Sequence, residues 1–279
     1  MTELTGRIAQ RFAQLAREGR QALIPYVVAG DPYADFTVAL MHKLVEAGAD
    51  IIELGVPFSD PMAEGPVIQK AHERALGKGI SLRDTLAMIA EFRQQDMDTP
   101  VLLMGYANPV FHMGYAAFAD AAKAAGLDAL LTVDMPPEEI AELDVHLKQV
   151  AMNNILLVAP TTLLERIEKI TEVASGFVYY VAVKGVTGAG HLDVAAVARH
   201  VAEIRSCSEL PVAVGFGIKD ATSAAAVARV ADGVVVGSAL VQLMADAAAA
   251  GDTEEAVCAV AAQFLAGLRS GIDTDEGTA

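Results

Sequence analysis

The stretch ADIIELGVPFSDPMAEGP, residues 49–66, joins a short apolar strand to a polar loop and decides the fold. Alternation along an extended chain places Ile52 and Leu54 on one face of the strand and Ile51 and Glu53 on the other. The strand is apolar apart from Glu53, and a buried acid is costly unless it is paired or used in chemistry. Glu53 is therefore either a structural anchor or a reacting group.

Seven further apolar runs of this kind alternate with longer helical patterns along the chain. The eight predicted strands are 23–30, 50–56, 100–106, 128–134, 154–160, 177–183, 211–217 and 233–237. Near-continuous apolar strands are typical of parallel sheets that are covered on both faces. In the segments between them, apolar residues recur at three- and four-residue spacing, which indicates amphipathic helices.

Eight strand–helix units in a chain of 279 residues predict an α/β fold, a (β/α)₈ TIM barrel. We expect one domain over residues 1–279, an extra N-terminal helix at about 2–18 and a short helix after the eighth strand. A final helix is expected from about Thr253 to Arg269, with a flexible tail at about 271–279. The alternative is an open doubly wound sheet. A dinucleotide-binding form of it needs a glycine-rich turn after the first strand, but AGDPYAD, residues 29–35, has one glycine.

The composition narrows the classes of function. A net charge of −16 disfavours nucleic acids and anionic membranes as partners. Two cysteines in helical patterns, with no signal-peptide pattern and no run of about 18 uncharged apolar residues, favour the reducing cytoplasm. The six histidines show no metal-ligand spacing, so no metal site is expected.

In a barrel, functional residues gather at the carboxyl ends of the strands. Glu53 would point into the barrel there, and none of the eight strands has an interior Lys or Arg to pair with it. Such an acid has a raised pKa and can exchange protons near neutral pH. The following loop carries Asp60, which could cap a turn, and Glu64, which is harder to explain as a turn residue.

Three glycine-bearing loops follow the last three strands, at residues 184–190, 215–220 and 237–240. Strands seven and eight commonly build a phosphate site in this fold. Glycines let backbone N–H groups approach phosphate oxygens, and Ser238 would add a hydroxyl at a helix N-terminus. Local donors of this kind would hold an anion on a chain that is acidic overall.

The strings ELGVPFSDPMAEGP, YANPVF, KGVTGAG, GFGI and GSALV, in this order and spacing, closely resemble the α subunit of tryptophan synthase over about residues 8–268. The resemblance implies a lyase of tryptophan biosynthesis that cleaves indole-3-glycerol phosphate to indole and glyceraldehyde 3-phosphate. It further implies an α2β2 complex. No cofactor is expected in this chain, because pyridoxal phosphate belongs to the β subunit.

The resemblance also implies roles for individual residues. Glu53 falls on the catalytic glutamate, and Glu64 falls on a second catalytic acid that is usually aspartate, so its side chain is one methylene longer. The other implied residues line the substrate pocket (Tyr26, Met104, Tyr179 and Thr187), bind phosphate (Gly188, Gly217, Gly237 and Ser238) or contact the β subunit (Pro57, Asn108 and Phe111).

The residues leave several alternatives open. Lys184, directly after the sixth strand, could form a Schiff base as in class I aldolases, or it is a solvated loop lysine. The chain could instead be mainly a regulatory subunit that binds a phosphate ligand. Tyr179 could be an ordinary core aromatic. The apolar residues of the predicted loop 106–114 either mark an interface or fold onto the barrel.

Overall fold

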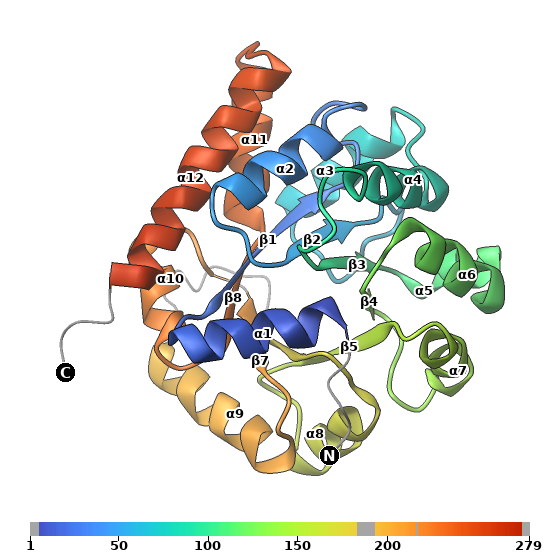
Figure 1. Cartoon of the computed structure of the whole chain (residues 1–279), viewed down its shortest axis with the longest axis vertical. Helices are drawn as coiled ribbons and strands as arrows, with labels where there is room; N and C mark the ends of the chain where they lie inside the picture. The colour runs from blue at the N-terminus through green and yellow to red at the C-terminus, as the bar shows by residue number, and fades with distance from the viewer. Residues whose placement is uncertain (1–5, 183–192, 216, 275–279) are drawn as a thin grey trace.

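The computed structural model describes residues 6–182, 193–215 and 217–274, and in it eight parallel strands close into a barrel in chain order (Figure 1). The strands are β1 (Ala22–Val28), β2 (Ile52–Gly55), β3 (Val101–Gly105), β4 (Ala129–Thr132), β5 (Asn153–Val158), β6 (Val178–Val181), β7 (Val212–Gly215) and β8 (Gly233–Val236). Each strand overlaps one predicted apolar run, so the predicted (β/α)₈ barrel is confirmed.

Helices surround the barrel and join successive strands (Figure 1). They are α1 (Arg7–Glu18), α2 (Thr37–Glu46), α3 (Pro66–Leu76), α4 (Leu82–Phe92), α5 (Ala107–Met113), α6 (Tyr115–Ala125), α7 (Ala141–Gln149), α8 (Leu164–Val173), α9 (Val194–Cys207), α10 (Ala221–Ala228), α11 (Ser238–Ala249) and α12 (Glu254–Thr274). Helix α1 precedes the first strand, and α11 begins directly after β8, both as expected.

Two predictions about secondary structure are wrong. The segment 106–114 was expected to be a loop, but Ala107–Met113 form helix α5, which ends at Gly114 with a φ of 86°. A seven-residue helix is too short to show periodicity, and Pro109 lies in its first turn, where proline is tolerated. Helix α12 continues to Thr274 rather than ending at Arg269, so residues 271–274 are helical. The rest of the predicted tail, 275–279, lies outside the described residues.

The barrel interior is filled by side chains from alternate strand positions and is closed at one end by α1. The inward residues include Ile24, Ile51, Leu102, Leu131, Ile155 and Val235. Ile8, Phe12 and Leu15 of α1 belong to the same buried cluster, and the rings of Phe12 and Phe177 lie 5.7 Å apart. Because α1 covers the amino ends of the strands, a pocket open to substrate must lie at the carboxyl ends.

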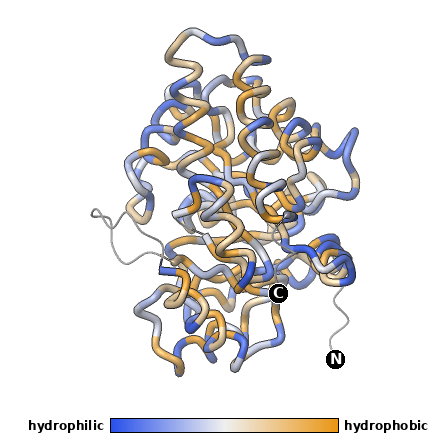
Figure 2. Tube along the Cα trace, turned by 90° about the vertical axis from the view of Figure 1, so that its left-hand side faces the viewer, coloured by the Kyte–Doolittle hydropathy of each residue, from blue (hydrophilic) through white to orange (hydrophobic). Residues whose placement is uncertain are grey.

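The outward faces of the strands pack against the helices. Ile52 and Leu54 of β2 belong to this outer cluster, as the alternation of the strand predicts. The peripheral helices alternate between hydrophobic and hydrophilic residues along the trace (Figure 2). Within the described residues, α12 is the one helix long and apolar enough to cross a membrane by length and composition. It packs on α2, α10 and α11 instead and buries residues such as Val257 and Leu265.

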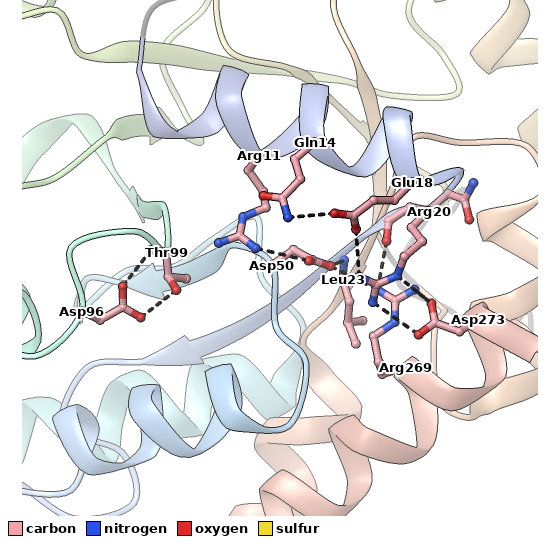
Figure 3. Close-up of polar contacts among 11 residues, drawn as sticks. Arg11, Gln14, Glu18, Arg20, Leu23, Asp50, Asp96, Thr99, Arg269 and Asp273 are labelled. Carbon is pink, nitrogen blue, oxygen red and sulfur yellow. Dashed lines mark hydrogen bonds and ion pairs between the residues drawn. The ribbon is translucent and has the colours of Figure 1, made fainter.

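Aspartates at the amino ends of three strands fasten neighbouring strands together. Asp50, Asp128 and Asp232 accept the backbone N–H groups of Leu23, Val101 and Val212, at 2.9, 2.8 and 2.8 Å. Each aspartate also forms an ion pair with an arginine. Figure 3 shows Arg11 and Arg269 converging on Asp50 from α1 and α12. These contacts lie at the end that α1 covers, so they stabilise the barrel rather than serve the site.

Candidate active site

Glu53 lies inside the barrel on β2, in register with Tyr26 of β1 and Leu102 of β3. Its side chain is completely buried, and among the described residues neither carboxyl oxygen has a hydrogen-bond partner. Burial, and then the nearby charge of Glu64, raises the pKa of Glu53 to about 8. The predicted orientation and the predicted raised pKa are both found, and Glu53 is predominantly a neutral acid at pH 7.

Glu64 is half-buried in the loop between β2 and α3. Burial raises its pKa to about 7, so it is partly ionised near neutral pH. Tyr26, Glu64 and Tyr179 line the same cavity, and Glu53 is in register with Tyr26 on the neighbouring strand. The charge of Glu64 accordingly contributes to the raised pKa values of Glu53, Tyr26 and Tyr179. The structure thus brings together two acids that are 11 positions apart in the sequence.

Two tyrosines at the cavity, Tyr26 and Tyr179, each lie over a glycine of the next strand. A Cβ atom on Gly55 would come within 2.3 Å of the Tyr26 hydroxyl, and one on Gly215 would come within 2.3 Å of the Tyr179 hydroxyl. Burial, and then the carboxyl groups of Glu53 and Glu64, keep the pKa values of both phenols well above 10. Both phenols therefore remain protonated and able to donate hydrogen bonds. These roles of Gly55 and Gly215 were missed in the sequence.

A cavity of about 1730 Å³ opens at the carboxyl ends of the strands and contains most of the predicted site. The predicted residues that line it are Tyr26, Glu64, Met104, Tyr179, Gly217, Gly237 and Ser238. Glu53 is not part of the cavity lining, but the charge of Glu64, which is, contributes to its raised pKa. Within the described part of the chain, no group of three or more His, Cys, Asp or Glu residues could hold a metal ion.

The glycines expected to bind phosphate lie across the cavity at the ends of β7 and β8. Gly217 has a φ of 81°, a conformation that favours glycine. Gly237 precedes the first residue of α11, Ser238, whose side chain is exposed. The first backbone N–H groups of a helix such as α11 have no partners within the helix, and such a terminus attracts anions. Lys184, Thr187 and Gly188 lie outside the described residues.

The residues expected to contact a partner differ in exposure. Phe111 on α5 is 69% exposed, and Asn108 on the same helix is exposed as well, whereas Pro57 is buried. Val110 folds onto the barrel and is 2% exposed. The apolar residues of α5 therefore divide between the buried Val110 and the exposed Phe111, and Phe111 and Asn108 are the predicted contact residues that remain accessible.

Two contacts on the Glu64 loop, residues 57–65, were also missed. Phe58 and Ala63 donate their backbone N–H groups to His72 and Tyr106, respectively. His72 stands 14 positions from Phe58, and Tyr106 stands 43 positions from Ala63. The sequence carried no signal for either contact, because each joins segments that only the fold brings together.

Comparisons with known proteins agree on one family. The family model described as tryptophan synthase alpha chain matches residues 12–268. The tryptophan synthase alpha chain of Leptothrix cholodnii is 55% identical over 272 residues, which are 98% of each chain. The crystal structure of tryptophan synthase subunit alpha from Legionella pneumophila is 42% identical, with a TM-score of 0.89 over 97% of this chain and 99% of that one. Tryptophan synthase from Mycobacterium tuberculosis, in an aminoacrylate-bound form, gives 35% identity and a TM-score of 0.83 over 95% of this chain and 100% of that one.

Proposed function

This chain belongs to the tryptophan synthase alpha chain family, and from that premise we propose that it cleaves indole-3-glycerol phosphate with Glu53 as the proton carrier. The products are indole and glyceraldehyde 3-phosphate, so the chain is a lyase. The observation that carries the assignment of Glu53 is its complete burial inside the barrel, where neither carboxyl oxygen has a hydrogen-bond partner among the described residues and where the charge of Glu64 reaches it.

The bond to be broken joins C3 of the indole to a carbon that bears a hydroxyl group. Direct cleavage would leave a poor carbanion at C3. Glu53 is neutral at pH 7 because its pKa is about 8, so it can first donate its proton to C3 and create an iminium. Its carboxylate then takes the hydroxyl proton. The carbon–carbon bond breaks, its electron pair restores the indole, and the hydroxyl carbon becomes the aldehyde.

Glu64 stabilises the positive charge that forms on the indole ring. With a pKa of about 7, its ionised form accepts a hydrogen bond from the indole N–H and stabilises the iminium. A charged contact of this kind contributes about 3 kcal/mol to the stability of a transition state. Tyr179 and Tyr26, with Met104, shape the pocket around the ring, and the phenols remain neutral beside the two acids.

The phosphate end of the substrate is assigned to the glycine loops. Gly217, Gly237 and Ser238 line the same cavity as Glu64, which supports a substrate that spans from the acids to these loops. Backbone N–H groups and the dipole of α11 would hold the phosphate dianion. We assign Thr187 to the substrate pocket and Gly188 to the phosphate loops on the family resemblance.

The remaining assignments also follow from the family. We propose that the whole chain is one domain that acts in the cytoplasm and binds a β subunit in an α2β2 complex. The exposed residues Phe111 and Asn108 would contact that subunit, and Pro57, which is buried at the start of the Glu64 loop, would contact it on the family resemblance. We propose that this chain needs no cofactor of its own and that pyridoxal phosphate belongs to the β subunit.

The test of Glu53 is the variant Glu53→Gln, which keeps the size of the side chain. The amide can neither donate the proton as an acid nor accept it as a carboxylate base. We expect the rate of indole release to fall by at least about 1000-fold. The affinity for glycerol phosphate should change by less than about twofold, because the phosphate loops are untouched.

Substantial turnover by Glu53→Gln, above about a tenth of the wild-type rate, would rule out Glu53 as the proton carrier. Borohydride trapping with substrate is the matching control for the aldolase alternative, because only a Schiff base on Lys184 would be fixed by reduction. Indole release by the isolated chain, measured with and without a β subunit, separates an enzyme from a purely regulatory subunit.

A further inference from the structure

The Glu64 loop, residues 57–65, is attached to the barrel at both of its ends. Near its start, the Phe58 N–H donates to Nδ1 of His72 at 3.0 Å. Near its end, the Ala63 N–H donates to the Tyr106 hydroxyl at 3.1 Å. The Phe58 ring also stacks on the Tyr106 ring, with centroids 4.9 Å apart and planes at 22°. These contacts leave Glu64 one residue beyond a fixed backbone position.

His72 is an unusual residue for its place in the structure. It lies on the inner face of α3 with only 2% of its surface exposed. Burial lowers its pKa to about 4, so the ring is neutral under ordinary conditions. Because Nδ1 accepts the Phe58 N–H, the proton is on Nε2, yet Nε2 is buried with no partner among the described residues.

A buried donor without a partner costs free energy. An apolar side chain at position 72 would remove that cost, but it could not accept a hydrogen bond from the loop. The sequence therefore tolerates an unfavourable ring nitrogen at a position where the other nitrogen holds the backbone of the Glu64 loop. His72 does not line the cavity, so its effect on the reaction must act through the loop.

We propose that His72 is a positioning residue for indole-3-glycerol phosphate cleavage, and that by holding the Phe58 N–H it fixes the loop that places Glu64 against the indole ring. This inference rests on the proposed role of Glu64. A displacement of about 1 Å in a group that acts on the transition state can cost about 100-fold in rate. The phosphate loops do not depend on this contact, so kcat should fall while KM changes little.

Two substitutions at position 72 isolate the hydrogen bond. His72→Leu fills similar space but cannot accept the Phe58 N–H, and we expect kcat to fall by about 10-fold to 100-fold. His72→Asn presents an oxygen near the position of Nδ1 and should restore kcat to within about threefold of the wild type. KM should stay within about twofold in both variants.

His42→Leu is the matched control. His42 is a second histidine whose buried Nε2 has no partner among the residues that the structure describes, and it packs on Phe92 with ring centroids 4.7 Å apart. It lies on α2 and has no hydrogen bond to the Glu64 loop among the described residues. Its replacement should change the melting temperature about as much as His72→Leu does, but it should leave kcat within about twofold of the wild type.

The proposal is overturned if folded His72→Leu keeps kcat within twofold of the wild type, or if His72→Asn is no more active than His72→Leu. If His72→Leu does not fold, ¹⁵N NMR of the wild-type ring decides the question: an Nε2-protonated tautomer supports the proposal, and an Nδ1-protonated tautomer overturns it. Failure of the proposed function itself is distinct, because the wild type would then release no indole.

Discussion

Glu53 combines three properties that the chain supplies from different elements. Strand β2 buries its side chain, the neighbouring loop brings the charge of Glu64, and no described residue pairs with its oxygens. Each of these effects favours the neutral acid over the carboxylate. The same effects make Glu53 costly to the folded state at high pH, because folding then requires a proton that the unfolded chain has lost.

The stability of the protein should therefore depend on Glu53 in a definite direction. The pKa of Glu53 is about 8 in the folded state, against 4.5 for the unperturbed side chain. Between these values the folded state binds more protons, so the free energy of unfolding falls as pH rises. Glu53→Gln removes this loss, and we expect the variant to be more stable than the wild type by on the order of 3 kcal/mol at pH 8 to 9.

Urea unfolding at a series of pH values from 5 to 9 measures this effect. The difference between Glu53→Gln and the wild type should be small near pH 5 and should grow as the solution becomes alkaline. A difference that does not change with pH would mean that Glu53 titrates normally in the folded protein.

At the level of single residues, the sequence predicted those properties that follow from local pattern. Alternation along one strand predicted that Glu53 points inward, and its expected burial with no lysine or arginine on any strand to pair with it predicted a raised pKa. The anchoring of the Glu64 loop by His72 and Tyr106 could not be predicted, because those contacts depend on how α3 and β3 pack beside the loop. The fit of each tyrosine over a glycine depends in the same way on the register between strands.

Among the elements, the strands owe part of their stability to aspartates at their amino ends. Asp128 accepts the Val101 N–H and meets Arg93 at 2.7 Å and Arg7 at 2.9 Å. Arg93 is only 6% exposed, and burial lowers its pKa. Its guanidinium therefore depends on the aspartate for compensation.

Asp128→Asn should destabilise the protein by about 3 kcal/mol, because a buried guanidinium then loses its counter-ion. The kinetics of indole release should not change, since Asp128 lies at the opposite end of the barrel from Glu53. Urea unfolding together with steady-state kinetics checks both statements. Glu46→Gln is the control, because it breaks the exposed pair with Lys43 and should cost less than about 1 kcal/mol. A loss as small as this control in Asp128→Asn would contradict the structural role.

The elements were predictable to different degrees. Each of the eight strands was found because a strand covered on both faces has to be apolar throughout. Helix α5 was missed because its seven residues give too short a period to recognise, and it contains a proline. The end of α12 was placed five residues too early, since Gly271 and Asp273 resemble a helix terminus. Gly271 instead lies close against Ala221 of α10, where a Cβ atom would approach the Ala221 Cβ to 2.7 Å.

The whole molecule has to bind a phosphate dianion although its net charge is −16. Charge repulsion acts over the Debye length, about 10 Å at 0.1 M salt, whereas hydrogen bonds from backbone N–H groups act only at contact. Added salt therefore weakens the repulsion more than it weakens the binding contacts. If glycine loops hold the phosphate, affinity should improve with moderate salt.

Raising the salt concentration from about 20 mM to about 200 mM should lower KM for indole-3-glycerol phosphate by about twofold. Steady-state assays at constant pH measure this change. A sugar at the same osmotic strength as the salt is the control, and it separates charge screening from crowding. A rise in KM would show that lysine or arginine side chains, rather than backbone donors, dominate the attraction.

The proposed proton transfer depends most directly on the protonation of Glu53 in the intact protein. The measurement is ¹³C NMR of labelled glutamate carboxyl groups, titrated in the wild type and in Glu64→Gln, with Glu53→Gln used to assign the signal. We predict that Glu53 titrates at about 8 in the wild type and at a lower pH in Glu64→Gln, because a neighbouring negative charge has been removed. Titration of Glu53 near 4.5 in both proteins would contradict the account.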